Sequence, residues 1–176
     1  MLIEYNGKKP KVSEKAFVAP DATLIGDVTV EEGASIWPGA RLRADFGSIV
    51  VGARSSVQDN AVIHVLPGGK SVIEEDVTVA HGAVLHNCTL KKGSVIGMNA
   101  VVLDNAVVGE QAIVAAGSVV TDGTQIPPRH LAAGVPAKPK KELSGNSLVW
   151  VEQSAKAYAK LAESYLNQGI GKARDE

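Results

Sequence analysis

The sequence predicts an all-β solenoid of hexapeptide repeats, followed by one helix that packs outside it. A branched aliphatic residue returns every sixth position over long stretches of the chain. A small residue follows most of these by four positions, and Gly, Asn and Asp are common between them. Six is neither the helical nor the strand period. Each hexad therefore supplies a short strand and a corner, and three hexads make one triangular coil.

Two runs carry this pattern. The aliphatic residues in step are Val18, Leu24, Val30, Ile36, Leu42, Leu90, Ile96, Val102, Val108, Val114 and Val120. The small residues at the second phase are Ala22, Ala34, Ala40, Ser94, Ala100, Ala106, Ala112 and Ser118.

The repeat is expected to run from about residue 17 to about residue 120, with two interruptions. Nine residues instead of six make the step 42–51, and ten make the step 63–73. A fixed coil does not absorb extra residues, so both segments are expected to loop outward. Residues 1–16 predict a lead-in strand and turn that closes one end of the prism.

The C-terminal part follows a different pattern. Prolines after residue 120 are expected to end the repeat, which makes 1–143 the solenoid domain with its lead-in. Apolar residues at helical spacing over 147–166 predict an amphipathic helix with Ser147 as its N-cap. Residues 144–176 thus form a helix and tail. The helix is expected to cover the outside of a prism, either its own or a neighbour's.

The composition excludes several classes of protein. A net charge of -1 with scattered basic residues argues against a nucleic-acid partner. The single cysteine, Cys88, excludes an internal disulfide framework and fits a reducing compartment. The N-terminus lacks the pattern of a signal peptide, and no stretch approaches the roughly 20 apolar residues needed to cross a bilayer. We therefore expect a cytoplasmic protein with no membrane partner.

Three of the four histidines fall in one central window, and the repeat assigns each to a face. Counting from Val18, His64 and His86 each follow a second-face aliphatic residue by one position. They are predicted to stack in one column, about 4.8 Å apart in backbone. Arg43 begins that column one coil lower.

His81 belongs to another column. It follows a first-face valine by two positions, and Asp59 occupies the equivalent place one coil below, beside Gln58. One prism holds the two columns apart, so three imidazoles would meet at one metal only between two chains of a threefold assembly. The alternative is that all three are solvated corner histidines. His130 is interpreted as a surface or packing residue and Cys88 as a small buried residue, and neither is predicted to be a ligand.

The combined motifs resemble one family. The strings LRADFGSIVVG, VQDNAVIH and HGAVLHNCTLKKGSVIGMNAVVLDNAVVGE are similar to the γ-class carbonic anhydrase family, and to its branch of phenylacetate-degradation and carnitine-operon proteins. The similarity covers about residues 17–143 and extends more weakly through the helix. It implies a left-handed parallel β-helix, a homotrimer, and hydration of carbon dioxide to bicarbonate by a metal-bound hydroxide.

Residue roles follow from this resemblance. It implies that His64 and His86 of one subunit and His81 of the next bind Zn²⁺, or Fe²⁺ or Co²⁺. Arg43 and Asp45 would form an ion pair across the subunit interface, and the alternative is an ordinary surface salt bridge. Gln58 would orient the hydroxide, and Asp59 would join the same network. Tyr158 matches a tyrosine that reaches the cleft in related proteins, although an aromatic residue at a helix-packing position explains it equally well.

Two departures from the family pattern widen the functional prediction. Phe46 stands where the family's archetype has a proton-transferring glutamate, and the segment VLPGGKSVIEED is shorter than the expected acidic loop. Slow carbon dioxide hydration is therefore expected. The alternatives are a metal-dependent thioesterase acting on acyl-CoA, and a trimeric metal-binding protein without turnover.

Overall fold

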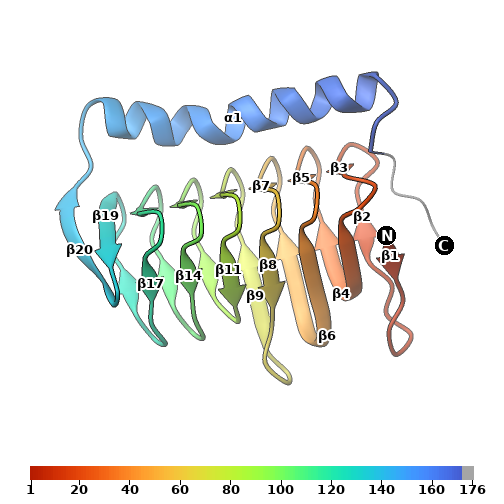
Figure 1. Cartoon of the computed structure of the whole chain (residues 1–176), viewed down its shortest axis with the longest axis horizontal. Coiled ribbons are helices and arrows are strands. Elements are labelled where there is room, and N and C mark those ends of the chain that lie inside the picture. The colour runs from red at the N-terminus through yellow and green to blue at the C-terminus, as the bar shows by residue number, and fades with distance from the viewer. Residues whose placement is uncertain (172–176) are drawn as a thin grey trace.

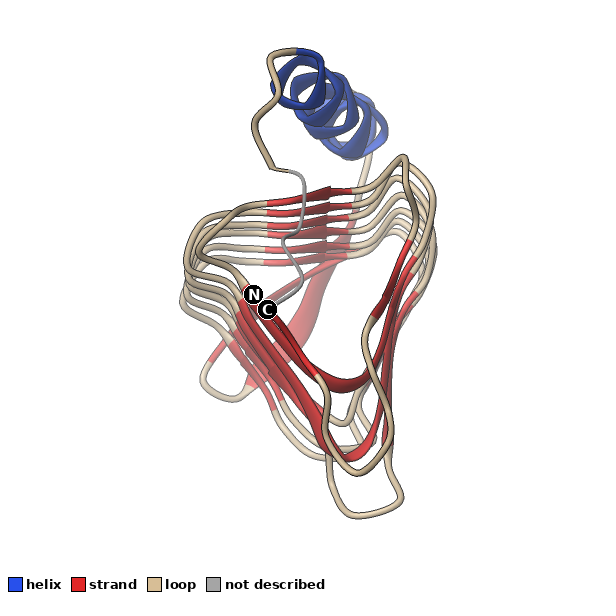
Figure 2. Cartoon of the chain, turned by 90° about the vertical axis from the view of Figure 1, so that its right-hand side faces the viewer, coloured by secondary structure: helices blue, strands red, loops and turns tan. Residues whose placement is uncertain are grey.

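A computed structural model describes residues 1–171 as a triangular prism of stacked coils with one long helix along one face (Figure 1). Seen from its end, the prism has three sides and three corners, and the helix stands over one side (Figure 2). The predicted solenoid with an external helix is confirmed. The end of the predicted tail, 172–176, lies outside the described residues.

Face one is a sheet of eight strands, and α1 (Asn146–Asn167) packs over it. Each coil adds one parallel strand, and only the last pair is antiparallel. In spatial order the strands are β3 (Phe17–Val18), β5 (Ser35–Ile36), β7 (Ser56–Val57), β10 (Thr78–Val79), β13 (Val95–Ile96), β16 (Ile113–Val114), β19 (His130–Gly134) and β20 (Ala137–Glu142).

Faces two and three belong to one twelve-stranded sheet that bends around the corner between them. The long strands β4 (Thr23–Val30) and β6 (Arg41–Val51) run through that corner. Face two continues with β8 (Val62–His64), β11 (Val84–His86), β14 (Val101–Val102) and β17 (Val119–Val120). Face three continues with β9 (Lys70–Ile73), β12 (Thr89–Leu90), β15 (Val107–Val108) and β18 (Gln125–Ile126). The lead-in strands β1 (Leu2–Ile3) and β2 (Lys11–Val12) pair with β4 as a first, partial coil.

The strand register confirms the faces assigned from the repeat. On face two Leu42 pairs with Ile63, and Ile63 pairs with Leu85. On face one Val57 pairs with Val79. All five side chains are 0% exposed, because each inward position stacks on its equivalent one coil away. The core is thus a set of aliphatic columns packed along the prism axis.

The corners are tight turns that require left-handed backbone. Asn60 (φ 58°), Asp76 (φ 59°), Asn99 (φ 56°) and Gln111 (φ 54°) all occupy them. Asn and Asp tolerate this region better than other residues with a side chain, which explains their recurrence between the aliphatic positions.

The solenoid extends further than the sequence predicted. We expected it to end near Val120 because prolines follow, but Ile126 and Ala132 keep the six-residue step. Ile126 pairs with Val108 on face three, and Ala132 pairs with Val114 on face one. The intervening Pro127–Pro128 pair lies at a corner, where the missing N–H groups break no strand ladder.

Both insertions lie at the corner between faces two and three. The segment 42–51 is not a loop, contrary to expectation, because β6 passes through the corner as one strand. The segment 65–69 does loop outward between β8 and β9 (Figure 1). The two support each other: the amide of Gly68 donates to the carbonyl of Phe46 at 2.8 Å, and that of Ser48 to Gly69 at 3.1 Å.

The predicted N-cap at Ser147 is wrong. The helix begins at Asn146, and Gly145 is the N-cap residue with a φ of 52° and no side-chain capping bond. Leu143 is buried, and the left-handed glycine turns the chain into the helix directly after it. Ser147 therefore lies inside the first turn.

The helix covers the prism of its own chain. The periodicity of the sequence did not decide between this prism and that of a neighbouring subunit. The rings of Tyr158 and Tyr165 meet Trp37 edge-on, with centroids 5.5 and 5.3 Å apart. Tyr165 also meets Phe17 at 5.4 Å. These aromatic contacts fix the C-terminal half of α1 on face one. Among the described helices, none has both the length and the apolar character needed to cross a bilayer.

The corner geometry predicts a difference between two substitutions at one position. Gln111→Val should lower the free energy of unfolding by about 1–2 kcal/mol, because a β-branched residue fits left-handed backbone poorly. Gln111→Gly should not. Urea denaturation at a fixed protein concentration measures both, and equal losses in the two variants would mean that side-chain contacts decide stability here.

Candidate metal centre

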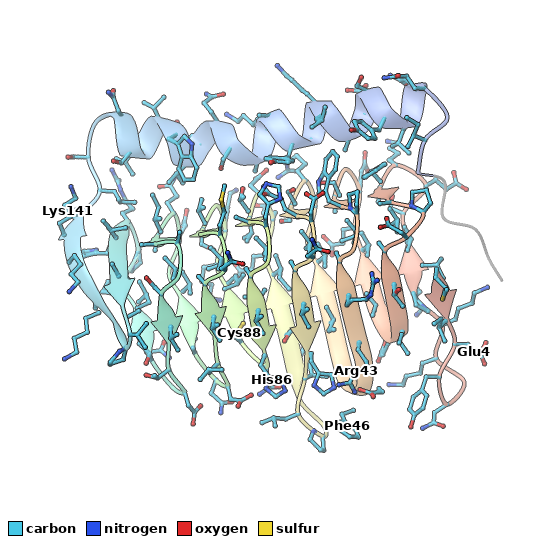
Figure 3. The ribbon with its side chains drawn as sticks, viewed as in Figure 1. Glu4, Arg43, Phe46, His86, Cys88 and Lys141 are labelled. Atoms are coloured by element: carbon cyan, nitrogen blue, oxygen red, sulfur yellow. The ribbon has the colours of Figure 1, made fainter. Side chains whose placement is uncertain are left out.

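His64 and His86 lie side by side at the corner between faces two and three. They are direct partners in the pairing of β8 and β11, and their ring centroids are 5.2 Å apart. Arg43 pairs with His64 one coil lower, as predicted. Figure 3 shows Arg43, Phe46 and His86 at this corner, on the side of the prism away from α1.

One nitrogen of each of these imidazoles lies within hydrogen-bond distance of a carboxylate oxygen. We call this the outer nitrogen, and we call the ring nitrogen that faces the other histidine the inner nitrogen. Asp45 Oδ1 lies 2.9 Å from His64 Nε2, and Asp104 Oδ1 lies 2.5 Å from His86 Nδ1. An ionised carboxylate only accepts hydrogen bonds, so the outer nitrogens must carry the protons. In the neutral rings the inner nitrogens, His64 Nδ1 and His86 Nε2, are then both lone-pair acceptors.

Those two inner nitrogens are 3.2 Å apart. Two lone pairs at that separation repel unless a cation or a proton lies between them. For Zn–N bonds of about 2.0–2.1 Å, this separation corresponds to an N–Zn–N angle of roughly 100°, near tetrahedral. The donor set and its spacing therefore fit two adjacent ligands of one divalent ion, with the tautomers set by the outer carboxylates.

Asp45 connects this pair to Arg43. The guanidinium of Arg43 donates to Asp45 Oδ2 at 2.5 Å within the same chain. Burial opposes ionisation of Asp45, but hydrogen bonds from Arg43 and His64 outweigh it and lower the pKa of the carboxyl group. Asp45 thus stays an acceptor for His64. The exposed ring of Phe46 lies 5.7 Å from that of His64.

His81 has the same arrangement at a different corner. It follows β10, at the turn between faces one and two, and its Nδ1 donates to Asp59 Oδ2 at 2.8 Å. Its Nε2 is left as an acceptor and faces the hydroxyl of Tyr158 at 3.4 Å. Burial and then the charge of Asp59 raise the pKa of Tyr158, so its hydroxyl stays protonated.

The two corners do not meet within one chain. Among residues 1–171, no three His, Cys, Asp or Glu side chains come together as a possible metal site. This agrees with the prediction that one prism holds the two histidine columns apart. The two corners are the opposite edges of face two.

The remaining candidate residues lie as follows. Gln58 is buried, and it lines an apolar cleft together with His81 and Tyr158. Cys88 is buried, and desolvation raises its pKa to about 12, which fits a packing role. His130 donates from Nδ1 to the carbonyl of Pro128 at 2.8 Å, away from the other histidines.

Sequence reasoning missed Asp104. It lies one coil beyond His86, just as Asp59 lies one coil before His81. A search for carboxylates one coil from each histidine would have found both, because residues in adjacent coils contact each other at a corner.

Comparisons with known proteins agree with this architecture. Residues 87–122 match the family model described as bacterial transferase hexapeptide (six repeats). The chain is 38% identical to a carbonic anhydrase of Geobacillus kaustophilus, over 94% of this chain and 91% of that protein. It is 39% identical to the carnitine operon protein CaiE of Citrobacter koseri, over 90% and 80% of the two chains.

Longer relatives and a solved structure extend the comparison. Gamma carbonic anhydrase 2 of Arabidopsis thaliana mitochondria is 42% identical over 95% of this chain, which spans 62% of that protein. A crystal structure of a Bacillus cereus protein superposes with a TM-score of 0.94 at 39% identity, covering 96% of this chain and 98% of that one. Together with the paired histidines, these relatives establish that the chain belongs to the γ-carbonic anhydrase family of hexapeptide-repeat proteins.

Proposed function

We propose that the protein is a homotrimeric metalloenzyme that hydrates carbon dioxide to bicarbonate at sites shared between subunits. His64 and His86 of one subunit and His81 of the next would hold the ion. The observation that carries this proposal is the pair of imidazole rings whose inner nitrogens face each other 3.2 Å apart. The outer nitrogen of each ring is hydrogen-bonded to a carboxylate. Imidazole donors suit Zn²⁺, Fe²⁺ or Co²⁺.

The shape of face two supports the threefold assembly. Its outward column is an uncovered row of valines, of which Val62 is 39% and Val84 37% exposed. The row continues in register through Val101 and Val119. If face two of each prism turns toward a common axis, the His86 corner of one subunit meets the His81 corner of the next, and three such contacts close a ring.

The chain's own residues then have distinct tasks. A divalent ion at the shared site would supply a nucleophile at neutral pH by lowering the pKa of a bound water to about 7. Asp45, Asp104 and Asp59 hold protons on the outer nitrogens, so the three inner nitrogens are available as ligands. Tyr158 and Gln58 lie beside His81, where their polar ends would orient a small oxygen-bearing substrate.

A second candidate is hydrolysis of an acyl thioester at the same ion. Phe46 supports it, because an exposed aromatic ring beside His64 replaces a proton-transferring acid and adds apolar surface to the site. A third is a metal that joins subunits without turnover. The hexapeptide transferase name of the matched model describes a fold that many activities share, so it does not decide among these.

Metal loading and parallel assays separate the three candidates. The protein should bind about one divalent ion per subunit, and chelation should remove an activity that the ion restores. Carbon dioxide hydration and acyl-CoA hydrolysis are measured on the same loaded sample. Thioester cleavage alone would favour the second candidate, and bound metal without either activity would favour the third.

Mixed trimers test whether the ligands come from two chains. His81→Ala and His64→Ala should each abolish tight metal binding. In trimers refolded from equal amounts of both variants, about a quarter of the interfaces should regain an intact ligand set. An intact interface needs the His81→Ala subunit on the side that supplies His64 and His86, and the His64→Ala subunit on the side that supplies His81. Metal content after gel filtration measures this recovery, and no recovery would show that one chain supplies all three ligands.

Removal of one supporting carboxylate should weaken the ion without removing a ligand. Asp104→Ala should lower metal affinity about 10- to 100-fold, because His86 loses the partner that fixes its tautomer. Asp122→Ala is the matched control, since Asp122 accepts from Asn105 and contacts no imidazole in the described structure. Chelator competition gives both affinities, and equal effects would contradict the role assigned to Asp104.

A further inference from the structure

An apolar cleft of about 450 Å³ lies between α1 and face one. Its floor is the outward column of Thr78, Val95 and Ile113, which pair in register across three coils. Its roof is one stripe of the helix, formed by Trp150, Ser154, Ala157 and Tyr158. This volume lies within the range of about 300–1,000 Å³ typical of small-molecule sites.

Small residues keep the cleft open at the corner where His81 lies. Ala80, Gly97, Ala115 and Ala116 line that side. A Cβ on Gly97 would stand 2.5 Å from the amide nitrogen of Ala116, so glycine is needed for this close approach. The large apolar side chains of Met98 and Trp150 border the cleft and are 54% and 53% exposed.

The polar groups gather at one end. Gln58, His81 and Tyr158 lie together there, with the hydroxyl of Tyr158 facing His81 Nε2 at 3.4 Å. Along the rest of the cleft, the hydroxyls of Thr78 and Ser154 bond to each other at 3.2 Å. The walls away from the His81 end are therefore suited to hydrocarbon, and the His81 end is suited to an oxygen-bearing head group.

We propose that this cleft binds the hydrocarbon chain of an acyl compound, with its carbonyl or carboxylate oxygens accepting hydrogen bonds from the amide of Gln58 and the hydroxyl of Tyr158, at the end of the cleft beside His81. The position of the head group rests on the proposed function, because the same end of the cleft leads to the proposed metal. The chain-binding part does not, since the floor and the roof of the cleft are formed within a single chain. The acyl chain would thus lie under α1 of the subunit that supplies His81.

The test uses a series of straight-chain carboxylates as probes. Butanoate, hexanoate and octanoate are titrated by calorimetry into the full-length protein, both metal-loaded and after chelation. Each added methylene group should raise the affinity about three- to fourfold until the cleft is full. The same rise should persist without metal, which separates this inference from the metal proposal that the mixed trimers test.

Two substitutions locate the binding. Ala157→Leu projects extra carbons into the cleft from an exposed helix position, so it should flatten the dependence on chain length. Ala159→Leu is the matched control, because Ala159 is on the same helix but does not line the cleft, and it should leave the dependence unchanged. Tyr158→Phe should weaken every probe by the same factor and keep the slope. Circular dichroism and gel filtration check that each variant folds.

Other results would overturn the inference. Affinity independent of chain length in the wild-type protein, or a slope that Ala157→Leu leaves intact, would show that the chain binds elsewhere or not at all. A slope that emerges only in Phe46→Ala would show that the neighbouring subunit's aromatic ring fills the cleft instead.

Discussion

The register of the coils is the constraint on which the rest of this structure depends. Each inward aliphatic residue stacks on its equivalent one coil away. If one coil shifted its pairing register by one residue, its aliphatic side chains would point to solvent. That requirement fixes the outward and corner positions as well. His86 is held beside His64, and His64 beside Arg43, because the buried residues next to them are locked in the same pairing. The packing of the core therefore also fixes the relative positions of the histidine side chains.

The carboxylates give this scaffold its chemistry. Asp45, Asp59 and Asp104 each bind the outer nitrogen of one histidine, so all three rings present their other nitrogen as an acceptor. Two of these acceptors face each other at one corner, and the third lies across face two. A single chain therefore contains the three rings that the proposed metal site needs, but the shape of the prism holds one of them away from the other two. Assembly is what can bring them together.

The fold could be predicted from the sequence because the six-residue period is long, regular and chemically simple. The same period assigns His64, His81 and His86 to their columns from the sequence alone. The prediction is wrong where another feature was given more weight than the period: Pro127 and Pro128 suggest the end of the repeat, although they occupy a corner and the six-residue step continues past them. At the helix start, the N-cap residue is Gly145 and not Ser147. The contact of Asp104 with His86 and the cleft under α1 were missed for another reason. Both depend on side chains that meet across coils or across layers.

The hairpin of β19 and β20 has a consequence for the molecule as a whole. A parallel solenoid that simply stopped would present a row of unpaired N–H and C=O groups, the template on which further strands grow into fibres. On face one the chain reverses, and β20 pairs with the exposed edge of β19 in antiparallel sense. The strand β20, which is now the edge of this sheet, carries exposed Lys138, Lys140 and Lys141. Its Pro139 has no N–H group to donate to a further strand. Like charge and a missing donor make this end a poor seed for end-to-end polymerisation.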